Sequence, residues 1–435
     1  GRAQAVQAEA AGIPCCTDMN PLLLKPQSDH TSQVVLNGRP IGNRDAYDYF
    51  RREGREQLRR EVCAAYDRLA ARYSPIVMEG AGSISELNLK DSDLVNMPMA
   101  RHADANVILV GDIDRGGVFA SVYGSIALQS EEDRRRIKGI IINKFRGDMR
   151  LFDEGRRILE DICGVPVLGV IPYFKDIHIE EEDSVSLAQK SRQMAQGRVN
   201  VAVVMLQHIS NFTDFDALEH DPRIHLFYTQ SADDLAQADI VIVPGSKSTL
   251  HDLYELRRNG MAQTIVRAHR EGKTVLGICG GYQMLGVEVC DPLHVEGDID
   301  RLPGLGLLPT TTVLAGEKRT VQVRTQEGYV GYEIHNGETR PFGDAKPSPL
   351  FVLDDGREDG YKVSERCMGT YVHGILDNHA FVDELLQPYA DKLKQTDDVF
   401  DYRAFKEQQY DKLADHVRQH VDMNQIYRIM GYTFS

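Results

Sequence analysis

The stretch TVLGICGGYQMLG, residues 274–286, decides how this chain is interpreted. Its apolar start predicts a strand, and the residues after Cys279 favour a helix. A cysteine at such a tight turn is held above the edge of a sheet, and flanking glycines let backbone and substrate approach it. A helix N-terminus stabilises a thiolate, and the N–H groups from Gly280 onward point to where an oxyanion would form. Lone cysteines are usually small buried residues, but this context predicts a nucleophile that attacks a carbonyl.

Length and composition limit the number of domains and the kinds of partner that we expect. A chain of 435 residues exceeds what one core usually organises, so two domains are expected. The formal charge of -15 argues against nonspecific binding to nucleic acid or to an anionic membrane. No apolar run is long enough to span a bilayer and no leader opens the chain, which predicts a cytoplasmic protein. The seven cysteines are scattered without a CxxC pair, so neither a disulfide framework nor a zinc site is expected.

Apolar β-type runs alternate with helical patterns in the first part of the chain. The apolar spacing over 55–73 predicts an amphipathic helix. Strands are predicted at 75–80, 106–112, 137–145 and 167–172. Nearly continuous apolar strands that alternate with helices indicate a parallel sheet covered on both faces. The fold class is therefore α/β.

A polar stretch, residues 184–198, is typical of a linker. The α/β pattern then resumes, with strands predicted at 199–206, within 239–249 and at 274–279, a β-rich region over 320–373 and helices from Asp401. We predict two domains that meet near residue 195, a first over 1–190 and a second over 198–435 that includes the C-terminal helices.

A cysteine nucleophile needs a base from elsewhere in the sequence. His373 in GTYVHGIL ends a β-like run and precedes Gly374, which would bring its ring to the carboxyl edge of a sheet, where catalytic groups of open α/β folds gather. His335 in GYEIHNG is the second choice. The turn PGSKST, 244–249, is not a complete phosphate-binding loop. Its N–H groups are instead expected to complete an oxyanion hole opposite Gly280.

Three predicted strand ends in the first domain carry polar groups. Glu79 ends the first of them and could hold a metal ion. The next two ends carry Asp112, Asp114 and Arg115, and then Asn143 and Lys144. Because parallel strands end at the same edge, these groups are expected at one phosphate or Mg²⁺ site.

In order along the chain, ten segments resemble the glutamine-dependent cobyric acid synthase family of cobalamin biosynthesis. They are GRAQA, MNPLLLKPQSD, EGAGSISELNL, DIDRGGVFAS, INKFRGD, HISNFTDFDAL, PGSKST, GICGGYQMLG, GYEIHNG and GTYVHGIL. The resemblance implies a dethiobiotin-synthetase-like, P-loop-type domain joined to a class I, flavodoxin-like amidotransferase domain.

The resemblance also implies a reaction. Cys279 would attack the side-chain amide of L-glutamine, His373 would move protons, and Gly245, Ser246, Gly280 and Gln283 would bind glutamine and the oxyanion. ATP and Mg²⁺ would activate carboxylates of a corrinoid, adenosylcobyrinic acid a,c-diamide, and ammonia would amidate four of them. No tightly bound cofactor is expected.

This sequence departs from the expected patterns at two places. Classical amidotransferases have a Glu two residues after the histidine, where this chain has Ile375, which leaves a dyad. The family's phosphate loop precedes GRAQA, so a chain that begins at Gly1 is expected to lack the first strand and that loop. Such a polypeptide is expected to hydrolyse glutamine weakly and not to complete the ATP-dependent step.

Three other functions are alternatives. A cobyrinic acid a,c-diamide synthase would share both domain types, although GRAQA and ISNFTDF favour the first choice. A non-catalytic or regulatory module would fit a missing phosphate loop. An α/β-hydrolase or cysteine protease is disfavoured because no acid lies near His373 in the sequence.

Overall fold

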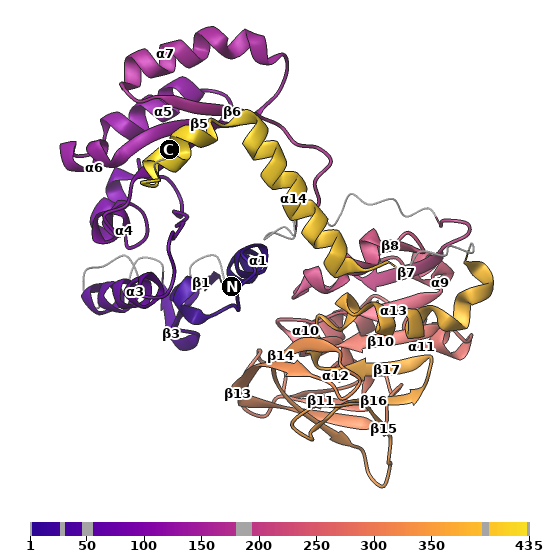
Figure 1. Cartoon of the computed structure of the whole chain (residues 1–435). Coiled ribbons are helices and arrows are strands. Elements are labelled where there is room, and N and C mark those ends of the chain that lie inside the picture. Colours follow the sequence, from indigo (N-terminus) through magenta and orange to yellow (C-terminus); the bar gives the residue numbers. More distant parts are fainter. Residues whose placement is uncertain (1, 27–30, 46–54, 180–193, 394–399, 433–435) are drawn as a thin grey trace. The chain divides into compact units, whose positions relative to one another are not determined.

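The computed structural model describes residues 2–26, 31–45, 55–179, 194–393 and 400–432 (Figure 1). It divides into two units, one formed by 1–179 with 407–435 and the other by 180–406. Both contain parallel strands with helices beside them, as the sequence predicts. No described helix has the length and apolar character that crossing a membrane requires. Most of the predicted linker, residues 184–193, lies outside the described residues.

The first unit contains a parallel sheet in the order β4-β5-β6. Its strands are β4 (Val107–Asp112), β5 (Ile137–Phe145) and β6 (Val167–Pro172). Ile140 and Ile142 of β5 are fully buried and form one core with Leu159 of α7 (Asp153–Cys163). The remaining helices of this part are α1 (Arg2–Ala10), α3 (Arg55–Ala70), α4 (Met97–His102), α5 (Val118–Ala127) and α6 (Glu131–Arg136).

Two features of the first unit differ from the sequence prediction. Residues 75–80 form no strand, because a strand requires a hydrogen-bonded neighbour and none of the described strands pairs with them. Val77 is 87% exposed there. The first unit also has a separate antiparallel sheet that the sequence analysis does not predict. It consists of β1 (Leu22–Pro26), β2 (Thr31–Leu36) and β3 (Arg39–Asp45).

The C-terminal helices α14 (Tyr402–His420) and α15 (Met423–Ile429) form where helices are predicted. Residues 407–435, however, group with the first unit, whereas we expected them in the second domain. Val421 pairs with Gly169 of β6 in an antiparallel bridge, and the Asp422 N–H donates to the carbonyl of Leu168 at 2.8 Å. The segment therefore continues the edge of the β4-β5-β6 sheet.

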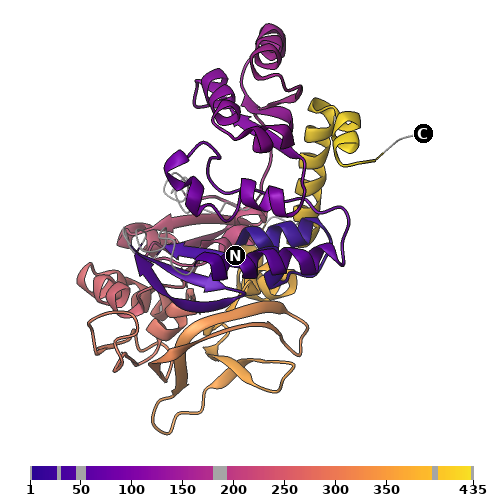
Figure 2. The same cartoon turned by 90° about the vertical axis from the view of Figure 1, so that its left-hand side faces the viewer.

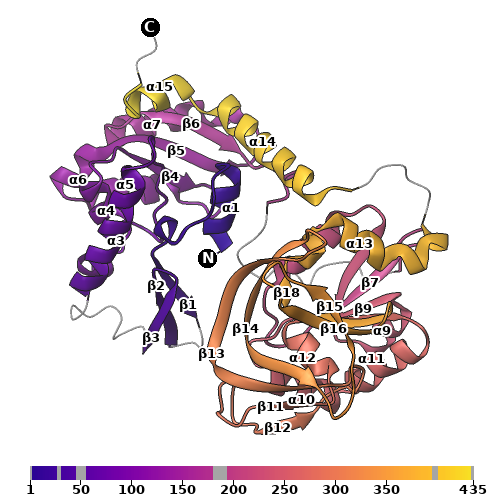
Figure 3. The ribbon, with the colours of Figure 1, turned by 60° about the horizontal axis from the view of Figure 1, so that its bottom comes forward.

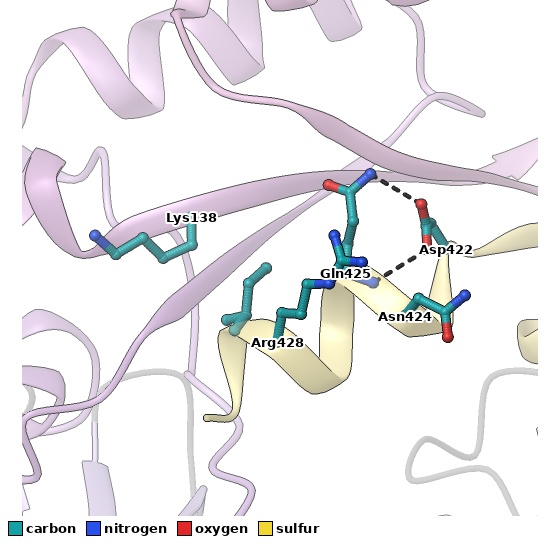
Figure 4. Close-up of a pocket in the computed structure, with 6 residues that line it drawn as sticks. Lys138, Asp422, Asn424, Gln425 and Arg428 are labelled. Atoms are coloured by element: carbon teal, nitrogen blue, oxygen red, sulfur yellow. Dashed lines mark hydrogen bonds between the residues drawn. The ribbon is translucent and has the colours of Figure 1, made fainter. Parts of the chain in front are cut away.

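A pocket of the first unit opens beside this segment (Figure 4). It is lined by Lys138 of β5 and by Asp422, Asn424, Gln425, Arg428 and Ile429. Asp422 caps α15, since its carboxylate accepts from the Gln425 N–H at 3.0 Å and from the Gln425 side chain at 2.9 Å. None of the residues that line it is a predicted site residue.

The second unit is built on a seven-stranded sheet in the order β15-β16-β17-β10-β9-β7-β8. Its strands are β7 (Val199–Val204), β8 (Ile224–Thr229), β9 (Ile240–Val243), β10 (Thr274–Ile278), β15 (Ser348–Val352), β16 (Glu358–Ser364) and β17 (Cys367–Thr370). The five from β17 to β8 are parallel, and β15 and β16 are added antiparallel. Residues of β7, β9 and β10 are buried throughout, which explains their continuous apolar sequences.

A second sheet of this unit has the order β12-β11-β13-β14-β18. Its strands are β11 (Glu288–Cys290), β12 (Arg301–Pro303), β13 (Thr310–Arg324), β14 (Val330–Pro341) and β18 (Val372–His373). The long pair of β13 and β14 lies within the orange part of the ribbon in Figure 2 and is labelled in Figure 3. The helices of the unit are α8 (Asp216–His220), α9 (Ala232–Gln237), α10 (Thr249–Arg258), α11 (Met261–Arg270), α12 (Gly280–Leu285) and α13 (His379–Leu386).

Candidate active site

Cys279 lies between β10 and α12, in the elbow that the sequence predicts. Its backbone has φ 51° and ψ -110°, a conformation that costs energy for any residue with a side chain. The Cys279 N–H donates to the carbonyl of Thr370 in β17 at 2.8 Å. The residue is buried, and its Sγ lies 3.7 Å from the carbonyl oxygen of Ile334. The helix that follows has only six residues, so it contributes a smaller dipole than a long helix would.

The two glycines after Cys279 allow the elbow to approach β9. A Cβ on Gly280 would lie 2.9 Å from the nitrogen of Ser246, and a Cβ on Gly281 would lie 1.8 Å from the carbonyl oxygen of Val243. Side chains would therefore clash with the backbone at both positions. The glycines bring the N-terminus of α12 against the turn that follows β9, as expected for two sides of an oxyanion hole.

His373 ends β18 and is fully buried. Its Nδ1 lies 2.6 Å from Oδ2 of Asp214, a residue 159 positions earlier in the chain. The other carboxylate oxygen of Asp214 accepts the Gly374 N–H at 3.1 Å. The opposite ring nitrogen, Nε2, is buried and has no hydrogen-bond partner among the residues that the structure describes.

Charge around His373 favours its protonated form. Burial opposes protonation, but the charges of Asp214 and Cys279 outweigh it and raise the pKa of His373 well above its ordinary value. The thiol and the imidazole lie against the same strand, because Cys279 Sγ lies 3.7 Å from the carbonyl oxygen of Ile334 in β14 and Tyr332 of β14 pairs with His373. Cysteine, histidine and carboxylate therefore form one connected group.

His335, the second choice for the base, has a different environment. Its Nδ1 bonds to the carbonyl of Gly337 at 2.8 Å, and its ring stacks on Tyr371 with centroids 3.7 Å apart. Burial lowers the pKa of His335, so it is held in the neutral form. No carboxylate bonds to its ring in the described structure, and His373 is the better base on this geometry.

Gly245 and Ser246 belong to the turn after β9, beside the segment 208–210. The Ser210 N–H donates to the Gly245 carbonyl and the Lys247 N–H to the His208 carbonyl, each at 2.9 Å. The Ser246 hydroxyl donates to buried Asp252 at 2.6 Å. The turn is thus fixed on both sides, with Ser246 facing Gly280.

Gln283, which we expected to contact glutamine, is buried. Its carbonyl oxygen accepts from the Thr249 hydroxyl and its amide nitrogen bonds to the Tyr371 hydroxyl, both at 3.2 Å. In this structure Gln283 joins α12 to its neighbours, and its contact with glutamine stays a prediction.

The structure brings four of the predicted first-unit residues together. Asp112 and Asn143 are register partners at the carboxyl ends of β4 and β5. Asp112 pairs with Lys144 at 2.9 Å, and its other oxygen accepts the Asp114 N–H at 2.9 Å. The hydrogen bond from Lys144 lowers the pKa of Asp112.

The other two predicted residues of the first unit are less well placed. Glu79 accepts from Gln7 of α1 at 2.8 Å and, within the described part of the chain, has no hydrogen bond or ion pair with Asp112 or Lys144. Arg115 is exposed and follows Asp114 in the loop after β4. Asp114 pairs instead with Arg146 at 2.5 Å, and that hydrogen bond lowers the pKa of Asp114.

The sequence analysis missed Asp214. It lies in the segment that follows β7, and β7 is parallel and adjacent to β9 in the sheet that also holds β10 and β17. A signal was available, because HISNFTDFDAL places polar residues directly after a buried strand. Asp214 was not predicted because it lies far from His373 in the sequence. Where we expected a dyad of cysteine and histidine, the structure gives the histidine a carboxylate partner.

Comparisons with known proteins identify the domains of the chain and its relatives. A model of the CobB/CobQ-like glutamine amidotransferase domain matches residues 200–381, and a model of an AAA domain matches residues 25–181. A cobyric acid synthase from Bacteroides fragilis is 71% identical over 435 residues, which cover 99% of this chain and 88% of that protein.

Other relatives have the same name. Cobyric acid synthases from Phocaeicola vulgatus and Parabacteroides distasonis are 67% and 56% identical, with 99% and 98% of this chain and 88% and 87% of those proteins covered. The chain therefore belongs to the cobyric acid synthase family of ATP-dependent ligases, whose function is glutamine-dependent amidation in cobalamin biosynthesis.

Proposed function

We propose that Cys279 and His373 release ammonia from L-glutamine and that the first domain uses this ammonia to amidate four peripheral carboxylates of adenosylcobyrinic acid a,c-diamide. One observation carries the proposal. A strained cysteine elbow follows β10, and a buried histidine with a carboxylate partner follows the end of the neighbouring parallel strand β17 by three residues.

In the proposed reaction, His373 Nε2 takes the thiol proton of Cys279 to form the thiolate–imidazolium pair that the raised pKa of His373 favours, and the thiolate then attacks the side-chain amide carbon of glutamine. The negative charge on the amide oxygen is stabilised by the N–H groups of Gly280 and Ser246, which the close approach of the two segments supports. His373 then gives its proton to the leaving nitrogen, and ammonia departs. Water attacks the resulting thioester with His373 as base, which releases glutamate and restores the thiol.

The polar edge of β4 and β5 fits a nucleotide and its metal ion. Asp112 and Asp114 offer carboxylate oxygens of the kind that Mg²⁺ prefers, and Lys144 and Arg146 beside them offer cations for phosphate. ATP with Mg²⁺ would supply the phosphoryl group that activates a corrinoid carboxylate. These residues would hold the phosphates and position the metal. The use of ATP supports the predicted cytoplasmic location.

Substitution of the nucleophile tests the proposal. In Cys279→Ser, glutamate release is expected to fall about a thousandfold or more, because the hydroxyl is a far weaker nucleophile than the thiol. In a full-length protein that carries the family's phosphate loop, amidation driven by added ammonium salt should persist, since it bypasses the elbow. The measurement is glutamate formed per enzyme, with corrinoid products separated by chromatography.

A matched control is available in the same unit. Cys290 is a half-buried cysteine of β11, and Cys290→Ser should keep glutamine-driven activity near the parent value. Glutamine-driven amidation by the Cys279→Ser variant would remove Cys279 from the mechanism.

A further inference from the structure

We propose that Asp214 is the positioning residue for His373, taking the place of the acid that classical amidotransferases have two residues after the histidine. This inference rests on the proposed function of Cys279 and His373. It assigns the role to the segment 208–215, which follows β7 and lies far from His373 in the sequence.

The first argument is the geometry of the carboxylate. Oδ2 of Asp214 lies 2.6 Å from His373 Nδ1 and Oδ1 accepts the Gly374 N–H at 3.1 Å, so both oxygens hold the same turn. A carboxylate only accepts hydrogen bonds, which places the ring proton on Nδ1. Nε2, the other ring nitrogen, is then the one that exchanges a proton with Cys279. With side-chain exposures of 0% and 3%, neither partner exchanges its bond for water.

The second argument is how rigidly Asp214 is held. It lies in a 3₁₀ helix, Phe212–Phe215, and its N–H donates to the carbonyl of Asn211 at 2.9 Å. Phe215, the next residue, is fully buried in the core of the unit. Asn211 itself has φ 51°, so the chain turns sharply just before the acid. A buried anchor on one side and a tight turn on the other fix the carboxylate.

The third argument is that Glu333, another buried acid near His373, is occupied. Glu333 precedes His335 in β14, but its carboxylate pairs with Arg319 at 2.8 Å and with Arg357 at 3.1 Å. Other titratable groups near the ring are Cys279, His335, Asp377 in the turn after Gly374, and Tyr332, whose ring stacks on His373 with centroids 5.3 Å apart. Within the described residues, Asp214 alone supplies a carboxylate to this imidazole.

The same segment also fixes the other half of the site. Ile209 and Ser246 form an antiparallel bridge, and the bonds from Ser210 and Lys247 described above flank it. Residues 208–215 therefore position the turn that faces Gly280 as well as the base. Because one segment holds both, an acid from this segment keeps His373 aligned with the turn at Ser246.

The test compares Asp214→Asn, Asp214→Ala and Asp214→Glu in the full chain. Asparagine keeps the shape but can present an N–H to Nδ1 and favours the wrong tautomer, so kcat for glutamate release should fall roughly 10²- to 10⁴-fold with little change in KM. Glutamate at this position keeps the charge and should recover part of the rate. Asp216→Asn, two residues further on, is the matched control and should stay within threefold of the parent.

A second readout separates positioning from a structural role. Iodoacetamide alkylation of Cys279, followed from pH 5 to 9, reports the thiolate that a protonated His373 stabilises. Without the Asp214 charge the imidazolium is less stable, so the alkylation curve should move to higher pH in Asp214→Asn. The far-UV circular dichroism of the same preparation should match that of the parent, which shows that the variant is folded.

The inference is overturned if Asp214→Asn and Asp214→Ala keep kcat within threefold of the parent and the alkylation curve does not move. It is equally overturned if Asp214→Asn loses the parent's far-UV circular dichroism signal together with its kcat, because that pattern marks a folding defect. Retained glutamine use in Cys279→Ser would instead refute the proposed function, so the two failures are distinguishable.

Discussion

Asp359 is a buried carboxylate close to the active-site residues in sequence and in space. It lies in β16, is 4% exposed, and accepts hydrogen bonds from the Thr370 hydroxyl and from the Tyr371 N–H, the latter at 3.1 Å. Burial raises the pKa of Asp359 to about 6, and the two hydrogen bonds only partly oppose that effect. The charged form is therefore less stable in the folded protein than in the unfolded chain.

This raised pKa predicts a pH dependence of stability. The folded protein binds the proton of Asp359 more tightly than the unfolded chain does. Protonated Asp359 therefore contributes fully to stability below the pKa that it has in the unfolded chain, and this contribution is lost as pH rises through about 6. From about 4 to 6 the loss amounts to roughly 3 kcal/mol. Asp359→Asn cannot titrate, and we expect its free energy of unfolding to fall less than that of the parent across pH 4.5–7. Urea unfolding at several pH values measures the free energy of unfolding of the parent and of the variant. Parallel curves for parent and variant would contradict the prediction.

At the scale of elements, α12 and β9 pack without side-chain space between them. The helix must lie close to β9 so that Gly280 faces Ser246, and Gly281 is what permits this approach. The strained elbow is the cost of placing a nucleophile at that position, and packing of α12 against β9 and β10 compensates for it.

Gly281→Ala tests this packing. Its Cβ would overlap the carbonyl of Val243, so α12 must shift, and we expect a loss of about 2 kcal/mol in stability together with a fall in glutaminase kcat. Gly316→Ala, in the same unit, meets no atom within 4 Å and should change both by little. Chemical unfolding and glutamate release are the measurements. Normal activity in Gly281→Ala would mean that the contact is not needed.

At the scale of the whole molecule, the chain leaves the first unit, forms the second and returns. The returning residues, 407–435, bond to β6 through Val421 and Asp422, and the His416 ring bonds to the carbonyl of Pro172 at 3.0 Å. Synthetase and amidotransferase parts are therefore linked by two passages of the chain rather than one.

Gly169→Ala tests this return. A Cβ at Gly169 would lie 2.4 Å from the carbonyl oxygen of His420, so the variant should loosen the C-terminal segment. We expect trypsin to cleave within α14 several-fold faster, while glutaminase activity stays unchanged. Gly124→Ala in α5 is the control, because its site is open and alanine there should stabilise the helix by about 0.5–1 kcal/mol. Equal cleavage rates in all three proteins would contradict the inferred contact.

The sequence alone predicted the elbow and the buried parallel strands, which the structure has, and His373 as the base, which stays a prediction. Each depends on local signals: a cysteine between glycines, continuous apolar runs, and a histidine at a strand end. The same local rules were wrong for residues 75–80, because an apolar run becomes a strand only where a neighbour can pair with it.

Three contacts became known only from the tertiary structure. They are the hydrogen bond of Asp214 to His373, the pairing of residues 208–215 with the turn at Ser246, and the contact of the C-terminal helices with β6. These contacts join residues far apart in the chain, and no periodicity or spacing encodes which strand ends become neighbours. Strand order is decided by how the whole sheet packs, so the carboxylate that orients His373 could be found only after β7, β9, β10 and β17 were placed side by side.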